Sequence, residues 1–219
     1  MTYRKIPTAI LISGRGSNMM SLVEAARSAD FPADIVTVIS NRPDAAGIGW
    51  AEAQGLATLV IDHKAYKTRE AFEAELDKAL VASKAEIIAL AGFMRLMTPG
   101  FVASWQTRMI NIHPSLLPTF KGLHTHDQAL AAGVKVAGCT VHFVRAEMDA
   151  GPIIAQAAVP VLSGDTADRL AARVLAAEHK LYPAALRLLA SGQVRCDDEK
   201  VTISQDVNDS PPLFSPNVP

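Results

Sequence analysis

The feature that most constrains this chain is the regular alternation, through its first half, of short apolar runs with helix-forming stretches. The runs are apolar throughout, as strands of a parallel sheet are when helices cover both faces. The stretches between them carry apolar residues at the three- and four-residue spacing of an amphipathic helix. The alternation predicts a doubly wound, mostly parallel α/β sheet. The expected strands are 8–12, 35–39, 58–61 and 87–91, and the expected helices are 19–29, 45–54 and 69–83.

The second half follows a different pattern. A short apolar run at 109–112 predicts a further strand, and two longer runs follow at 136–144 and 153–161. The turn-forming sequence Asp149-Ala150-Gly151-Pro152 joins them, so we expect an antiparallel pair that extends the sheet.

The chain ends in a long helical pattern and a tail. Helical spacing runs over 166–189, and Asp165 or Thr166 is a suitable N-terminal cap. Beyond residue 203 the sequence holds two proline-containing stretches and little periodicity. We therefore expect one domain over residues 1–203 and a poorly ordered tail over 204–219.

Composition restricts the classes of function. The net charge is −1, so the chain has no basic excess for a nucleic-acid backbone, and no apolar run approaches the ~20 residues of a membrane span. The first residues carry no apolar signal core, which predicts a cytoplasmic protein. The two cysteines, Cys139 and Cys196, lie far apart and are expected as free thiols.

A glycine-rich loop, Ser13-Gly14-Arg15-Gly16-Ser17-Asn18, follows the first expected strand. Glycine allows close approach of a ligand to the backbone, and the N-terminus of the next helix attracts a phosphate. Ser17 and Asn18 add side-chain donors. The alternative is a tight turn in which one of these two residues caps the helix.

The loop is a poor dinucleotide-binding sequence. Met19 replaces the third glycine of that motif, and the second strand ends in Ser40-Asn41-Arg42 without an acidic residue for a ribose. A phosphate monoester therefore suits the loop better than a pyrophosphate. Arg42 suits a 2′-phosphate, which leaves an NADP-dependent oxidoreductase as an alternative.

A second group of polar residues follows the strand at 109–112. Asn111 and His113 alternate in an extended chain, so their side chains share one face near a carboxyl end, where ligands collect in open α/β sheets. An amide and an imidazole there suit a developing oxyanion. Asp149, in the turn between the late strands, is the candidate carboxylate beside the imidazole. An ordinary turn residue is the alternative for Asp149.

Other chemistries are less well supported. His124 and His126 follow His113, but their spacing matches no standard metal-ligand pattern, so no metal is expected. The chain has no Gly-x-Ser-x-Gly sequence and neither cysteine has an activating position. His63 and His179 stand apart and are expected at the surface.

Taken together, these motifs resemble the folate-dependent phosphoribosylglycinamide formyltransferase family, over about residues 10–182. Part of the likeness is shared with methionyl-tRNA formyltransferases and formyltetrahydrofolate deformylases, which carry additional domains. The segments that carry the resemblance, in order, are 12–18, 40–42, 91–95, 111–118, 122–126 and 149–152.

The resemblance implies a Rossmann-like fold and direct transfer of a formyl group from 10-formyltetrahydrofolate to the amine of glycinamide ribonucleotide, in purine synthesis. It implies small-molecule partners and no metal, and it does not give the oligomeric state. The implied catalytic residues are Asn111, His113 and Asp149. The implied substrate-binding residues are Gly16, Ser17, Asn18 and Glu178. The implied folate-binding residues are Arg69, Met94, Arg95, Leu96 and Met97, together with Asn111.

Three other functions remain open at this point. An NADP-dependent oxidoreductase would use the glycine-rich loop but leaves Asn111 and His113 unexplained. A sensor of a phosphorylated metabolite would bind without turnover. A formyltetrahydrofolate hydrolase would replace the amine with water.

Overall fold

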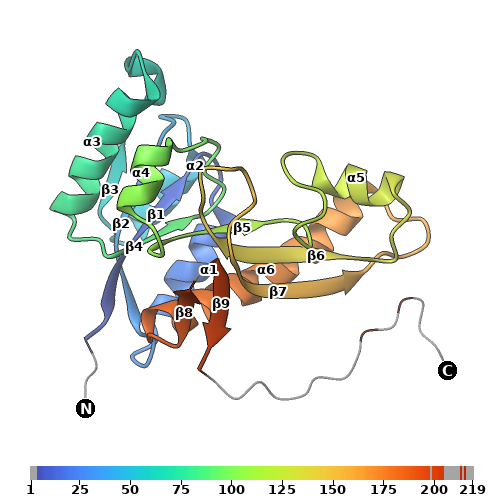
Figure 1. The fold of residues 1–219 in the computed structure, drawn as a ribbon. Helices are drawn as coiled ribbons and strands as arrows, with labels where there is room; N and C mark the ends of the chain where they lie inside the picture. Colours follow the sequence, from blue (N-terminus) through green and yellow to red (C-terminus); the bar gives the residue numbers. More distant parts are fainter. Residues whose placement is uncertain (1–3, 198, 205–212, 214, 216–219) are drawn as a thin grey trace.

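A computed structural model of the chain describes residues 4–197, 199–204, 213 and 215. Its centre is a seven-stranded sheet in the order β3-β2-β1-β4-β5-β6-β7 (Figure 1). The first five strands pair in parallel, and β6 and β7 continue the sheet antiparallel. The strands are β1 (Ile6–Ile12), β2 (Ala33–Ser40), β3 (Thr58–Val60), β4 (Ile87–Leu90), β5 (Met109–His113), β6 (Val136–Phe143) and β7 (Ile153–Pro160).

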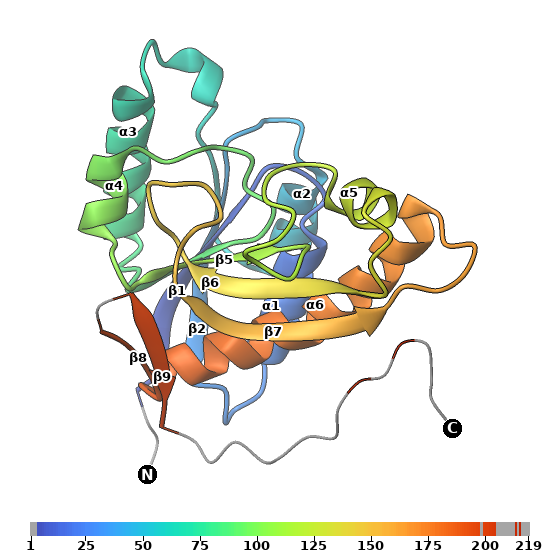
Figure 2. The same cartoon turned by 45° about the vertical axis from the view of Figure 1, so that its right-hand side comes forward.

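Helices cover both faces of the sheet because its central strands are apolar on both sides. In β1, Ile10 and Ile12 pack in the core with α1 and α6, whereas Ala9 and Leu11 pack in the core with α3 and α4. Figure 2 shows α1 and α6 across the sheet from α3 and α4. The helices are α1 (Ser17–Ala26), α2 (Ala46–Ala53), α3 (Arg69–Ala82), α4 (Pro99–Ser104), α5 (Thr125–Ala131) and α6 (Ala167–Ala190).

The predicted doubly wound sheet with its antiparallel extension is confirmed. Every expected strand and helix forms, and the boundaries shift by up to three residues, as at the end of α1. The structure adds α4, α5, a 3₁₀ turn at His63–Ala65, and a two-stranded hairpin of β8 (Val194–Asp197) and β9 (Lys200–Ile203). These elements are too short to show a clear period in the sequence. Of the expected tail, only residues 204, 213 and 215 lie among the described residues.

The sheet arrangement places three loops at one edge. Since β1, β4 and β5 are parallel neighbours, the loops that follow them leave the sheet at the same side. Tyr182 of α6 is fully buried beneath β4 and β5, and its hydroxyl donates to the carbonyl oxygens of Leu90 and Ile110 at 3.0 and 3.2 Å. None of the described helices combines the length and apolar character that a bilayer crossing requires.

Candidate active site

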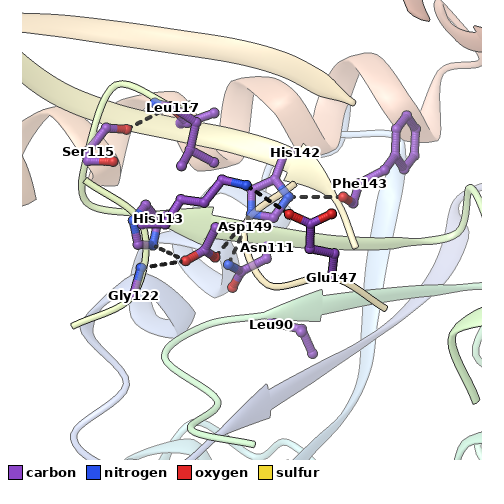
Figure 3. Close-up of polar contacts among 12 residues, drawn as sticks. Leu90, Asn111, His113, Ser115, Leu117, Gly122, His142, Phe143, Glu147 and Asp149 are labelled. Atoms are coloured by element: carbon purple, nitrogen blue, oxygen red, sulfur yellow. Dashed lines mark hydrogen bonds and ion pairs between the residues drawn. The ribbon is translucent and has the colours of Figure 1, made fainter. Parts of the chain in front are cut away.

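Asn111, His113 and Asp149 come together at the carboxyl end of β5 (Figure 3). Their neighbours Ile110 and Ile112 point into the core with α6, so the alternation of the strand turns Asn111 and His113 to the opposite face. Asp149 reaches this face from the β6–β7 loop, with its Oδ2 atom 3.4 Å from His113 Nδ1. Both side chains are at least nine-tenths buried, which limits screening of the pair by water.

His142 belongs to the same cluster, although no sequence motif pointed to it. It lies opposite Asn111 in the β5–β6 pair, and its Nε2 atom is 3.2 Å from Asn111 Nδ2. Its Nδ1 atom donates to the carbonyl oxygen of Phe143 at 2.9 Å, which leaves Nε2 to accept from the amide. Burial lowers the pKa of His142, so the neutral form is favoured. Its selection requires the register between β5 and β6, which no pattern in the sequence supplies.

Two loops enclose His113. Its Nε2 atom donates to the carbonyl oxygen of Phe120 at 3.0 Å, and the backbone N–H of Gly122 donates to Asp149 Oδ2 at 2.9 Å. Asp149 itself holds a left-handed conformation with φ of 52°, which aims its carboxylate at the histidine rather than leaving it an ordinary turn residue. Both ring nitrogens of His113 therefore face protein acceptors in this conformation. A ligand that takes a hydrogen bond from Nε2 must replace the Phe120 carbonyl.

The glycine-rich loop presents an open helix terminus. Gly16 is the N-terminal cap of α1 with φ of 71°, and no side chain caps the helix. The alternative in which Ser17 or Asn18 caps α1 is therefore wrong. Helices begin with N–H groups that have no intrahelical partner, so this terminus suits an anion.

Asn18 and α6 extend the same site. Asn18 Nδ2 donates to Glu178 Oε2 at 2.6 Å, and burial raises the pKa of Glu178, an effect that the hydrogen bond from Asn18 opposes. Asn18 Oδ1 and His179 Nε2 are buried and have no hydrogen-bond partner among the described residues. The expectation that His179 and His63 lie at the surface is wrong, because both are half-buried. Asn18 Oδ1, beside the start of α1, is therefore an unused acceptor for a ligand.

The segment after β4 lies against the glycine-rich loop. The backbone N–H of Met94 donates to Ser13 Oγ at 2.7 Å, and that hydroxyl donates to Asn41 Oδ1 at 2.5 Å. Met94 and Leu96 expose their side chains, Arg95 is half-buried and Met97 is buried. Exposed apolar side chains beside a polar site suit a flat ring system.

The structure does not unite all the expected residues. Arg69 is the exposed first residue of α3, and no described contact connects it to the cluster. His124 points outward, with its side chain 81% exposed. Among the residues that the structure describes, no group of three or more His, Cys, Asp or Glu side chains is arranged so that it could hold a metal ion. Burial raises the pKa of the Cys139 thiol to about 12, which makes it a poor nucleophile.

Comparison with known proteins gives the family. The profile of the formyl transferase family matches residues 6–186. Phosphoribosylglycinamide formyltransferase of Escherichia coli is 42% identical over 85% of this chain and 88% of its own length. A crystal structure of glycinamide ribonucleotide transformylase 1 from Symbiobacterium toebii superimposes with a TM-score of 0.88, at 47% identity, covering 91% of this chain and 94% of that one.

A larger protein also matches. The trifunctional purine biosynthetic protein adenosine-3 of Bos taurus is 52% identical over 88% of this chain, which spans only 19% of the larger protein. The relatives support neither the oxidoreductase nor the hydrolase alternative. The family profile and the matching full-length relatives establish that this chain belongs to the formyl transferase family, among the phosphoribosylglycinamide formyltransferases.

Proposed function

We propose that this chain transfers the formyl group of 10-formyltetrahydrofolate to the amine of glycinamide ribonucleotide, a step of purine synthesis. The observation that carries the proposal is the cluster of Asn111, His113 and Asp149 at the carboxyl edge of the sheet, in which the side chains of His113 and Asp149 are nine-tenths buried. An amide and a histidine paired with a carboxylate are the groups that acyl transfer between two nitrogen atoms requires.

The acceptor substrate occupies the glycine-rich loop. Its phosphate binds the free N–H groups of Gly16, Ser17 and Asn18 at the start of α1. Glu178 lies beside Asn18 and is available to the ribose hydroxyls. This assignment accounts for a helix terminus without a side-chain cap and for a buried carboxylate that forms no ion pair with any residue the structure describes.

The formyl donor occupies the segment that follows β4. The segment Met94–Met97 follows β4 and lies between the glycine-rich loop and the catalytic cluster in the order of the sheet. Its backbone receives the pterin ring, and the exposed side chains of Met94 and Leu96 cover it. Arg69 contacts the folate in this proposal by family resemblance alone.

The reaction forms one carbon–nitrogen bond and breaks another. The amine nitrogen of the acceptor attacks the formyl carbon, the bond from that carbon to N10 breaks, and one proton moves from the amine to N10. Asn111 donates its second N–H to the developing oxyanion, since its first is held by His142. His113 exchanges the Phe120 carbonyl for the reacting oxygen, and Asp149 stabilises the charged imidazole and assists the proton transfer.

Alignment of two substrates at one sheet edge supplies much of the remaining acceleration.

The test follows the absorbance of 10-formyltetrahydrofolate with and without glycinamide ribonucleotide, in the presence of a chelator. Consumption only with the ribonucleotide supports the transferase. Equal consumption without it indicates a hydrolase, and no consumption by folded protein contradicts the proposal.

A further inference from the structure

The β6–β7 loop, residues 144–152, has a fixed base and carries Asp149. The N–H of Phe143 donates to the carbonyl oxygen of Pro152, and the N–H of Val144 donates to Met109, both at 2.9 Å. Gly151 lies so close to Phe143 that an added Cβ would be 1.7 Å from its carbonyl oxygen. Backbone contacts therefore determine the conformation at the base of the loop. The residues between this base and Asp149, the arms of the loop, are held by side-chain contacts.

Arg145, the second residue of this loop, points away from the cluster and toward the C-terminal hairpin. Its Nε atom lies 3.0 and 2.9 Å from the two carboxylate oxygens of Glu199. Its Nη1 atom donates to the carbonyl oxygen of Val144 at 3.0 Å, and its Nη2 atom contacts Cys196 Sγ at 3.7 Å. The Arg145 side chain is only 15% exposed. Its guanidinium group joins the loop to β8 through Cys196 and to the turn of the hairpin through Glu199.

The hairpin is a firm support. Val194 is buried in the core, and Val201 and Ile203 pack against the same cluster. Both views of the fold place the tip of β8–β9 beside the base of the β6–β7 loop (Figure 1, Figure 2). Glu199 occupies this tip in a left-handed conformation with φ of 62°. The hairpin lies beyond residue 186, where the match to the family profile ends.

The functional role of Asp149 requires that its loop hold one conformation. Asp149 contacts His113 and Gly122 through the same carboxylate oxygen, so a shift of the loop arm breaks both contacts at once. Four residues, 145–148, lie between the fixed base and Asp149, and the first of them, Arg145, contacts the hairpin through Glu199 and Cys196. Small displacements of a catalytic group reduce turnover much more than they reduce binding.

We propose that Arg145 is a positioning residue, which holds the Asp149 loop against the C-terminal hairpin through its ion pair with Glu199. Arg145 affects the rate of the reaction through Asp149, and this role rests on the proposed formyl transfer. It also predicts a local ordering of the loop that can be measured without any substrate.

The test uses the full chain and Glu199→Gln, which removes the charge and keeps the size of the side chain. Because Glu199 is largely exposed, we expect a modest effect, about fivefold on kcat, with KM for the ribonucleotide unchanged. Asp197→Asn is the matched control. Asp197 belongs to the same hairpin and pairs with Arg195 at its surface, away from the loop. We expect Asp197→Asn to leave kcat at the wild-type value.

A double-mutant cycle separates positioning from a general structural effect. If Glu199 acts through Asp149, Glu199→Gln has no further effect on kcat in an Asp149→Asn background. An equal fold-loss in both backgrounds contradicts the proposal. So does a loss of the same size in Asp197→Asn.

Amide hydrogen exchange of residues 144–152 provides the readout that does not depend on activity. We expect Glu199→Gln to accelerate exchange in this loop by about fivefold while exchange in β5 and α6 stays unchanged. Wild-type exchange rates in the variant's loop overturn the positioning role, whatever the enzyme assay shows. If the wild-type protein does not catalyse formyl transfer, that result overturns the proposed function instead.

Discussion

The side-chain amide of Asn111 and the imidazole of His142 face each other across the β5–β6 pair, with Nδ2 and Nε2 3.2 Å apart. The carbonyl oxygen of Phe143 accepts from the other ring nitrogen, so His142 is an acceptor toward Asn111. This relationship fixes the orientation of the amide: one N–H points at His142, and the other N–H and the oxygen remain for a ligand. His142 therefore acts on the reaction through Asn111.

His142→Phe removes the acceptor and keeps a planar ring in the buried position. We expect kcat to fall by about tenfold, the equivalent of one lost hydrogen bond, with little change in KM. The loss should be absent in an Asn111→Ala background. His124→Ala, at an exposed histidine, is the control and should leave kcat unchanged.

The tautomer of His142 can be measured directly. Burial lowers the pKa of this residue, so the ring should stay neutral, with its proton on Nδ1, at pH values where an ordinary histidine is half charged. Nitrogen chemical shifts between pH 5.5 and 7.5 test this expectation, and a ring that is charged at pH 6.5 contradicts it.

His113→Ala should reduce kcat by about 10²–10⁴-fold, since it removes both oxyanion stabilisation and proton transfer. KM for both substrates should change far less. Asp149→Asn should cost less than His113→Ala, and the double variant should be no slower than His113→Ala alone, because Asp149 acts on the reaction through His113. Steady-state and single-turnover kinetics of the three variants measure this. Additive losses, or equal losses in kcat and in substrate binding, contradict the assigned roles.

The ion pair of Asp165 with Arg173 connects the residue before the N-cap of α6 to the second turn of that helix. Two hydrogen bonds from Arg173, at 2.7 and 3.0 Å, and one from the N–H of Leu162 hold the pKa of Asp165 at about 2. A carboxyl group with a lowered pKa stabilises the fold above its unfolded pKa near 4 and loses that contribution as the pH falls toward 2. Asp165→Asn should therefore unfold at lower temperature at pH 7, with the difference from wild type shrinking between pH 4 and 2.

Thermal unfolding from pH 2 to 7 measures this difference. Asp168→Asn is the control, because Asp168 is an exposed carboxylate in the first turn of the same helix. A difference between Asp165→Asn and wild type that does not depend on pH would mean that the ion pair is not its cause.

The sequence predicts the architecture well and the site incompletely, for physical reasons. Runs of apolar residues determine the parallel strands, because burial on both faces excludes polar residues from them. The cluster of Asn111, His113 and Asp149 was predictable in composition, since two of its members alternate in one strand. The hydrogen bond from Asn111 to His142 was not, because it depends on the register between β5 and β6. The ion pair of Arg145 with Glu199 joins residues 54 positions apart and has no sequence pattern.

Glu178 offers a test in which stability and function move in opposite directions. The residue is 5% exposed, and burial raises the pKa of its carboxyl group. A carboxyl group whose pKa is raised by folding destabilises the fold as the pH rises from the unfolded pKa, near 4.5, through the folded pKa, because the unfolded chain ionises first.

Glu178→Gln removes this cost and can still accept the hydrogen bond from Asn18. We expect the variant to unfold a few degrees higher than wild type at pH 7.5, since 1 kcal/mol corresponds to roughly 2–4 °C in a chain of this size. The gain should disappear below pH 4.5, and KM for the ribonucleotide should rise about tenfold through loss of the charged acceptor. Calorimetry from pH 4 to 8 separates the two effects, with Glu75→Gln as the control, since the Glu75 side chain is 46% exposed. A variant that is no more stable at pH 7.5 contradicts the raised pKa of Glu178, and one that binds the ribonucleotide as the wild type does contradicts the assignment of Glu178 to the substrate site.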